Sequence, residues 1–288
     1  MKLNTLFTQG RPTFSLEIFP PKRSDKIDVL YRTLDGLADL KPDFISVTYG
    51  AGGGAAGNST CSIASHIKHE LNIEPLAHTT CVNATTQQVL ANLEELERNG
   101  IENVLALRGD LPEDGVLRGD FTHADQLAAL IRANSQMNVV GACYPEGHYE
   151  NKDLATDIDN LHYKLEAGVT HLITQLFFDN EKFYSFMDQL RGAGITVPVE
   201  AGIMPIVTTR QIERTVALSG ASLPTEFTHM VSRYSSNPEA LYHAGIAYAI
   251  EQICELLEHG AQGIHVYTMN NAKVARAVYD GVKSALGR

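Results

Sequence analysis

The sequence of 288 residues contains no long hydrophobic run. Crossing a bilayer takes roughly 18 to 20 consecutive apolar residues, and no stretch approaches that length. The first ten residues also lack an apolar segment followed by a small-residue cleavage site, as a secretory leader would have. We therefore expect a cytoplasmic protein without a membrane segment.

Positive charge is scarce. The chain has 23 Lys and Arg against 34 Asp and Glu, and its formal net charge is −11. A protein that neutralises nucleic-acid phosphates normally presents a basic surface, so this balance argues against nucleic acid as a partner, although it is compatible with a local basic pocket for a small anion. With 44% hydrophobic and 20% charged residues, the composition is that of an ordinary globular protein.

Cysteine is rare and scattered. No Cys-x-x-Cys motif and no cluster of cysteine with histidine occurs among Cys61, Cys81, Cys143 and Cys254. This spacing argues against a disulfide scaffold and against a zinc site, so we expect no bound metal. Each cysteine is expected to act as a small buried apolar residue.

Short runs of β-forming residues alternate with longer amphipathic segments along the chain. Helical spacing recurs between these runs, as in Leu127, Leu130 and Ile131, and a last helix is expected over 271–286. Strands that alternate with helices predict parallel pairing through crossovers. The eight expected strands cover residues 13–19, 43–49, 74–81, 103–107, 138–144, 171–178, 197–204 and 263–269.

Eight such units in about 250 residues predict an α/β fold of the (β/α)8 TIM barrel type, since a doubly wound open sheet usually has about five to seven strands. No composition break marks a linker, so we expect a single domain over residues 1–288. The stretch 218–238 is longer than a crossover requires and predicts an extra helix before the last strand, beginning near Pro224. In such a barrel the active site lies where strands end and the following loops begin.

Glu17 lies within the apolar first strand, whose sequence is Phe-Ser-Leu-Glu-Ile-Phe. Burial disfavours the ionised form of a carboxyl group, and a general acid that works near neutral pH needs the protonated form. We favour this catalytic role for Glu17. The alternative is a carboxylate paired with a neighbouring Lys or Arg.

A glycine-rich segment, residues 50–55, follows the second strand. Its Gly50-x-Gly52-x-x-Ala55 spacing matches the dinucleotide-binding fingerprint only weakly, because no acidic residue closes the following strand. A flexible loop over a ligand and a permissive turn without a ligand agree with the pattern equally well. His78, in the third strand, has no second metal ligand near it in the sequence.

Arg108, Gly109 and Asp110 come directly after the fourth strand. This order places a guanidinium group and a carboxylate at the barrel mouth with backbone exposed between them. Such a pair can hold an anionic cofactor while the carboxylate faces a heterocycle. The alternative is a structural ion pair between Arg108 and Asp110.

Further polar side chains follow the fifth and sixth strands. Asp157, Asn160 and Lys164 share one face of the expected helix, where they could contact a ribose or a pyrophosphate; a solvated polar face has the same pattern. Gln175 ends the sixth strand with an amide that both donates and accepts hydrogen bonds, which suits the edge of a pterin or a flavin.

Six segments at strand ends carry a resemblance to a known family. They read Phe-Ser-Leu-Glu-Ile-Phe-Pro-Pro around Glu17, Ser-Val-Thr-Tyr-Gly from Ser46, His-Thr-Thr-Cys from His78, Ala-Leu-Arg-Gly-Asp up to Asp110, Tyr-Pro-Glu-Gly-His from Tyr144, and Thr-Gln-Leu-Phe-Phe-Asp from Thr174. In this order they resemble the bacterial methylenetetrahydrofolate reductases over nearly the whole chain. The segments around Glu17 and Arg108 are the most diagnostic.

The resemblance implies a barrel that holds FAD without covalent attachment and reduces 5,10-methylenetetrahydrofolate to 5-methyltetrahydrofolate. NADH or NADPH would be the electron donor, and donor and folate would use one site in turn. Glu17 and Asp110 would be catalytic, and the folate would face Glu17, Asp110 and Gln175. The residues implied in cofactor binding are Thr48, His78, Arg108, Gly109, Asp110, Tyr144, His148, Asp157, Asn160 and Lys164.

Two positions depart from the pattern of the enterobacterial members. Asn271 stands where an Arg often contacts the folate, and Thr209 stands where a Phe often packs against nicotinamide and folate. We keep Asn271 as a candidate for substrate binding.

Two other functions stay open at this point. The chain could be a folate-binding methyltransferase barrel without flavin, or a flavoprotein subunit reduced by a partner protein. In each case the substrate is a small molecule, and we expect a homo-oligomer.

Overall fold

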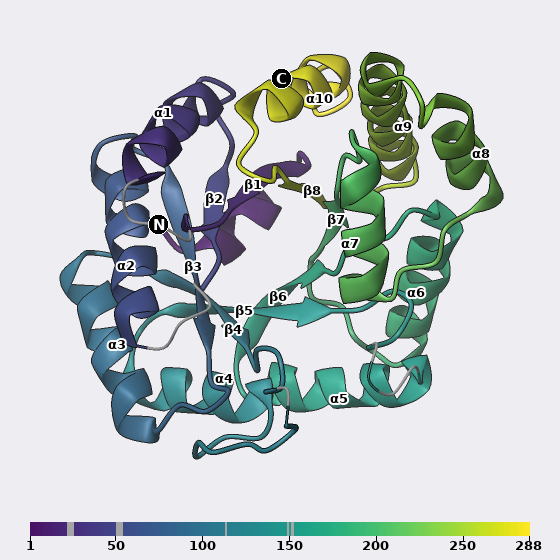
Figure 1. The fold of residues 1–288 in the computed structure, drawn as a ribbon. Helices are drawn as coiled ribbons and strands as arrows, with labels where there is room; N and C mark the ends of the chain where they lie inside the picture. The colour runs from purple at the N-terminus through teal and green to yellow at the C-terminus, as the bar shows by residue number, and fades with distance from the viewer. Residues whose placement is uncertain (22–25, 50–53, 113, 149, 151–152) are drawn as a thin grey trace.

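The computed structural model describes residues 1–21, 26–49, 54–112, 114–148, 150 and 153–288, without the side chains of 54–58, 213–214 and 216–218. Eight parallel strands form a closed barrel in chain order, with helices around it (Figure 1). This arrangement confirms the predicted (β/α)8 barrel. The strands are β1 (Thr13–Ile18), β2 (Phe44–Val47), β3 (Glu74–Thr80), β4 (Asn103–Leu107), β5 (Asn138–Cys143), β6 (Val169–Thr174), β7 (Val199–Ile203) and β8 (Gly263–Tyr267).

Local sequence explains the helices that follow the strands. In the first helix Leu30, Leu34 and Leu37 recur at helical spacing and are buried, so one apolar face packs on the sheet. The third begins with a capping box of Thr85 and Gln88. The helices are α1 (Ile27–Ala38), α2 (Gly54–His69), α3 (Thr86–Arg98), α4 (Ala124–Asn134), α5 (Leu154–Glu166), α6 (Asn180–Gly192), α7 (Thr209–Ser219), α8 (Thr225–Tyr234), α9 (Pro238–Glu258) and α10 (Ala272–Val282).

The expected extra helix before the last strand is α8, which begins directly after Pro224. The expected bounds of the sixth strand were wrong, because β6 spans Val169–Thr174 rather than 171–178. Leu176 and Phe178 are buried against Phe227 of α8, so the chain stays apolar after the strand has ended. Hydrophobicity alone therefore extended the expected strand too far.

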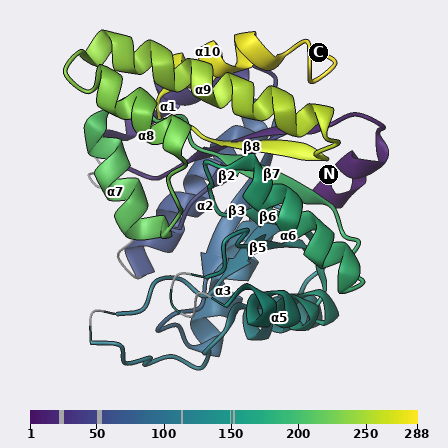
Figure 2. The ribbon, with the colours of Figure 1, turned by 90° about the vertical axis from the view of Figure 1, so that its right-hand side faces the viewer.

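A short 3-10 helix, η1 (Leu3–Thr8), closes the bottom of the barrel and was not predicted. Its Leu3 and Leu6 pack with Phe44, Leu76 and Leu105 inside the barrel. Both ends of the chain lie at this end, opposite the loops that follow the strands (Figure 2). The loops that follow the strands form the mouth of the barrel, where active sites lie in this fold.

The four cysteines form no disulfide bonds in the structure. All four cysteines are free thiols, and Cys61, Cys81 and Cys143 are buried, as expected, whereas Cys254 is half-buried. Burial raises the pKa of the Cys143 thiol to about 12, which keeps it unreactive near neutral pH. Within the described residues, no helix combines the length and the apolar character that a membrane span requires.

Candidate active site

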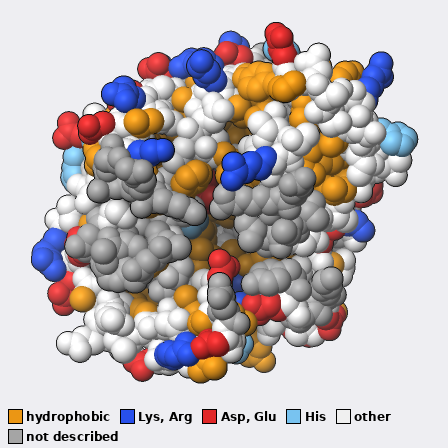
Figure 3. Space-filling model, viewed as in Figure 1, with side chains coloured by type: hydrophobic (Ala, Val, Ile, Leu, Met, Phe, Trp, Pro, Cys, Tyr) orange, Lys and Arg blue, Asp and Glu red, His pale blue; other side chains and the backbone are white. Residues whose placement is uncertain are grey.

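Two adjoining pockets lie at the barrel mouth. The larger, of about 500 Å³, is lined by β4, β5, α4 and α5, and the smaller, of about 280 Å³, lies over the barrel interior. Both are lined by Leu107, Arg108, Ala142, Tyr144 and His148, so they form one cleft. The same face of the molecule is hollowed near its centre (Figure 3).

Most of the expected site residues line this cleft. The smaller pocket contains Glu17, His78, Arg108, Gly109, Asp110, Tyr144, His148 and Gln175. The larger pocket adds Asp157, Asn160 and Lys164. The sequence pattern therefore selected residues of two strands, of the loops that follow three others, and of one helix, which the fold brings together.

Two of the expected site residues do not line these pockets, and part of one expected segment is not described. Among the described residues, neither Thr48 nor Asn271 lines either pocket. Asn271 caps α10, and its Oδ1 accepts a hydrogen bond from the Val274 N–H at 3.2 Å. Residues 50–53 of the glycine-rich segment lie outside the described part of the chain.

Glu17 faces two imidazoles and a hydroxyl group in the barrel interior. Its Oε2 lies 3.4 Å from His78 Nε2 and 3.6 Å from His265 Nε2. The Ser46 hydroxyl donates to the same oxygen at 3.4 Å. The Glu17 side chain keeps 18% exposure toward the smaller pocket, and no Lys or Arg among the described residues pairs with it. A carboxyl group in this place can exchange a proton with a ligand in the cleft.

His78 is a neutral neighbour of Glu17 rather than a counter-ion. Burial lowers the pKa of His78 to about 4, although the nearby Glu17 acts in the opposite direction. At neutral pH the imidazole is therefore uncharged. In the part of the chain that the structure describes, no group of three or more His, Cys, Asp or Glu side chains is arranged to hold a metal ion.

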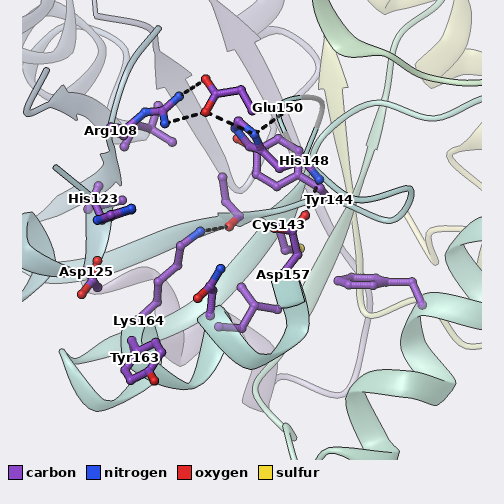
Figure 4. Close-up of a pocket in the computed structure, with 17 residues that line it drawn as sticks. Arg108, His123, Asp125, Cys143, Tyr144, His148, Glu150, Asp157, Tyr163 and Lys164 are labelled. Atoms are coloured by element: carbon purple, nitrogen blue, oxygen red, sulfur yellow. Dashed lines mark hydrogen bonds and ion pairs between the residues drawn. The ribbon is translucent and has the colours of Figure 1, made fainter. Parts of the chain in front are cut away.

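Arg108 forms a two-point ion pair with Glu150 (Figure 4). The sequence suggested Asp110 as an alternative partner, but Asp110 is exposed at the wall of the smaller pocket. Gly109 between them has a φ of 89°, and a Cβ atom there would lie 2.7 Å from Val82 Cγ1. This turn therefore requires glycine, because any side chain would be strained at this φ and would collide with Val82.

Lys164 adds a second cation to the larger pocket. Its Nζ donates to the Ala142 carbonyl at 2.8 Å, and burial lowers the pKa of Lys164, with Asp157 acting in the opposite direction. Asp157 accepts a hydrogen bond from the backbone N–H of His148. Asp157, Asn160 and Lys164 all line the pocket from α5, as their spacing predicted. Two cations beside a glycine turn suit an anionic ligand such as a diphosphate.

Glu200 is a fully buried acid deeper in the barrel. It lies on β7, and its exposure is 0%. Burial raises the pKa of Glu200 to about 7, although His265 and the hydroxyl groups of Thr13 and Ser15 act in the opposite direction. Near neutral pH this carboxyl group therefore changes its charge within the barrel.

Replacing Glu200 with Gln is expected to change how stability depends on pH. The folded chain keeps the Glu200 proton up to about pH 7, whereas the unfolded chain releases it near pH 4.5. The wild type therefore loses stability as the pH rises between these values, and the variant should gain about 3 kcal/mol relative to it. Chemical denaturation across this range measures the difference.

Two buried histidines act in the opposite direction in both proteins. Burial lowers the pKa of His78 to about 4 and that of His171 to about 3, so each removes stability as the pH falls below the ordinary value of 6.5. Because both proteins contain them, they cancel in the comparison. A difference between Glu200→Gln and the wild type that does not change with pH would contradict the prediction.

Comparison with known proteins places the chain in a family. It matches the methylenetetrahydrofolate reductase family over residues 2–283. The chain belongs to this family. It is 35% identical over 270 residues to the 5,10-methylenetetrahydrofolate reductase of Pectobacterium carotovorum, covering 94% of this chain and 90% of that protein. Identity to the Escherichia coli K12 reductase is 33% with the same coverage.

A more distant likeness concerns the fold. A Clostridium thermocellum protein that binds two copies of 5-methyl-5,6,7,8-tetrahydrofolic acid has a TM-score of 0.72 and 13% identity, with both chains fully covered. At this identity the likeness shows the barrel alone. Membership of the reductase family makes the chain an enzyme of the oxidoreductase class.

Sequence reasoning on this reductase family member missed several polar residues of the cleft and the barrel interior. They are Ser15, Ser46, Glu150, Glu200 and His265. Strand alternation could have found Ser15, which must share a face of β1 with Glu17. For His265 and Glu200, the only local signal was that each is a polar residue within a buried strand. No local signal in the sequence pointed to Glu150.

Proposed function

We propose that this enzyme reduces 5,10-methylenetetrahydrofolate to 5-methyltetrahydrofolate with FAD as its cofactor and NADH or NADPH as the electron donor. Family membership supports the reaction, and one relative from Arabidopsis thaliana, 35% identical, is named an NADH enzyme. The observation that carries the proposal is the placement of Glu17 and His78 in the same cleft as Arg108 and Lys164. A proton-exchanging group and an anion-binding wall thus lie side by side.

The cleft suits FAD in its chemistry. Arg108 and Lys164 would supply cations for a diphosphate. Asp157 and Asn160 would hold hydroxyl groups of the ribose or ribityl chain. Tyr144 and His148 line both pockets, and His78 and Asp110 would face the ring system.

The protein's own residues would supply a proton, orientation and an electric field. Bound FAD would carry the hydride between nicotinamide and folate. Glu17 would give its proton to a nitrogen of the folate's five-membered ring, whose carbon–nitrogen bond then breaks to leave an iminium cation. Asp110 would favour that cation by its negative charge, and Gln175 would hold the pterin edge with its amide.

The nicotinamide and the folate would occupy the same part of the cleft in turn, as a ping-pong reaction requires. We propose that Thr48 lies near the nicotinamide. We also propose that Asn271, directly before α10, contacts the folate when the folate binds. The Asn271 side chain already caps α10, so contact with folate would compete with that hydrogen bond. Homo-oligomeric assembly and a cytoplasmic location remain predictions.

Anaerobic visible absorption spectroscopy tests the proposed function. The purified protein is expected to show a flavin band that bleaches with NADH or NADPH and returns when methylenetetrahydrofolate is added. A colourless protein that also fails to take up FAD would favour the methyltransferase alternative. A flavin band that neither nucleotide bleaches would favour reduction by a partner protein.

Asp110→Asn is expected to raise the reduction potential of the bound flavin. A negative charge near the flavin disfavours its anionic reduced form, so removing the charge should raise the potential by on the order of tens of millivolts. Asp114→Asn is a matched control, because Asp114 is exposed in the same loop and is paired with Arg118. Spectroelectrochemistry measures the potential, and an unchanged or lowered value in Asp110→Asn would contradict the assignment.

A further inference from the structure

The barrel interior is polar along one side. Side chains alternate along a strand, so Thr13, Ser15 and Glu17 of β1 point to the same face. Glu200 of β7 and His265 of β8 contact these residues. The opposite side is filled by apolar residues of the barrel core such as Leu76 and Leu105, as is usual for barrels of this type.

The polar side chains form a connected series from Glu200 to Glu17. The Ser15 hydroxyl lies 3.3 Å from Glu200 Oε1 and 2.7 Å from His265 Nδ1. The other imidazole nitrogen, His265 Nε2, lies 3.4 Å from Ser46 Oγ and 3.6 Å from Glu17 Oε2. Ser15, Ser46, Glu200 and His265 are all fully buried. The path between the two acids is therefore shielded from bulk solvent.

The place that Glu200 occupies is built for a carboxyl group. A Cβ atom at Gly263 would overlap the Thr13 hydroxyl and lie 2.8 Å from Glu200 Cγ, so the glycine provides the space. Glu200 Oε1 takes part in hydrogen bonds with Thr13 and Ser15. Among the described residues, Glu200 Oε2 has no hydrogen-bond partner. A buried acid without a cationic partner is costly, and the mechanism proposed above does not use it.

We infer that Glu200 is a positioning residue that controls the proton of Glu17 through Ser15 and His265. The inference rests on the proposed function, in which Glu17 gives up a proton in each turnover. To restore it, Glu200 gives its proton to the Ser15 oxygen, Ser15 gives its own to His265 Nδ1, and His265 Nε2 gives one to Glu17. One proton moves in total, leaving Glu200 ionised, Glu17 protonated and the His265 proton on Nδ1. After product has left, Glu17 takes up a proton from solvent in the open cleft, and the same transfers in reverse return one proton to Glu200 and restore the His265 tautomer.

The ionisable groups around Glu200 determine the sign of the effect. His265 and Tyr267 face it from β8, His171 lies on the neighbouring β6, Glu17 lies beyond Ser15 on β1, and Asp43 precedes β2. When Glu200 is ionised, its negative charge favours the proton on the pair formed by His265 and Glu17. Glu200 therefore extends the pH range in which Glu17 can act as an acid.

The test is the pH dependence of the two half-reactions in Glu200→Gln. In the pH–rate profile of flavin reoxidation by methylenetetrahydrofolate, the alkaline limb should move to lower pH by about half a pH unit to one pH unit. Flavin reduction by NADH should keep its pH profile. Glu74→Gln is a matched control, because Glu74 lies at the bottom of the barrel and pairs with Lys68; it should shift neither profile.

A second measurement needs neither cofactor nor substrate. In NMR, the imidazole signals of His265 in the wild type should report the ionisation of Glu200 near pH 7, and this step should be absent in Glu200→Gln. If the wild type does not reoxidise flavin with the folate, the proposed function fails, whereas wild-type His265 signals without this step overturn the coupling by themselves. A merely structural role of Glu200 would change stability and leave no such step in the His265 signals.

The path through Ser15 is tested with Ser15→Ala. Ser15→Ala should slow flavin reoxidation by the folate, because the connecting hydroxyl group is gone, whereas flavin reduction by NADH should keep its rate. An unchanged rate of reoxidation in Ser15→Ala would overturn the route through Ser15. An unchanged limb in the single Glu200→Gln variant would overturn the inference as a whole.

Discussion

Glu17→Gln is expected to lower the rate of methylenetetrahydrofolate reduction by about 100-fold to 10,000-fold, the usual range for loss of a general acid. Glutamine keeps the size of the side chain and its contacts with Ser46 and His78, but it has no acidic proton to give. Reduction of the flavin by NADH needs no such proton and should be largely unchanged. Stopped-flow absorption measures the two half-reactions separately.

The separation of the half-reactions is the critical feature of this experiment. Equal losses in both would show that Glu17 shapes the cleft rather than supplying a proton. Glu94→Gln, an exposed change on α3, should leave both half-reactions at the wild-type rate. Because Gln fits the same space, the variant should also bind FAD as the wild type does.

The double variant Arg108→Leu with Lys164→Met is expected to weaken FAD binding by about 100-fold to 10,000-fold. Each cation that hydrogen-bonds a phosphate contributes about 1.5 to 3 kcal/mol, so losing both costs about 3 to 6 kcal/mol. Glu150 would also lose its partner and place an uncompensated negative charge beside the diphosphate. Titration of the cofactor-free protein with FAD, followed by fluorescence, measures the affinity.

A control must separate loss of a binding cation from general loss of charge. Arg191→Leu removes a guanidinium group that pairs with Asp188 on α6, outside the cleft. It should leave FAD affinity unchanged. Unaltered affinity in the double variant, with the fold intact by thermal denaturation, would place the diphosphate elsewhere.

The two parts of the cleft differ in chemical character. Arg108, Asp157 and Lys164 form a charged side suited to holding a cofactor. Glu17 and His78 form a more buried side suited to handling a proton, and Ser46 donates a hydrogen bond to Glu17 from behind it. Tyr144 and His148 border both pockets. Changes on one side should therefore alter affinity, and changes on the other should alter the rate of the folate half-reaction.

The sequence by itself predicted the barrel and most of the residues that line the candidate cleft. Alternating strands and helices predict parallel pairing, and the ends of parallel strands meet at one mouth. This is why Glu17, Arg108 and Gln175, which are far apart in the sequence, could be expected in one cleft. Helical spacing likewise sufficed for Asp157 and Lys164, because a helix face repeats at a fixed period.

Only the tertiary structure decided which partners these residues meet. Closure of the barrel pairs β1 with β8, so His265 comes to Glu17 across some 250 positions of sequence, as the contact of Ser15 with His265 shows. Parallel strands are buried on both sides, so polarity alone does not reveal that Glu200 faces inward. Glu150 reaches Arg108 from a loop whose path no local pattern determines. Local sequence patterns determine the helices and strands. The contacts between distant side chains depend on strand register and on closure of the barrel, which only the whole fold determines.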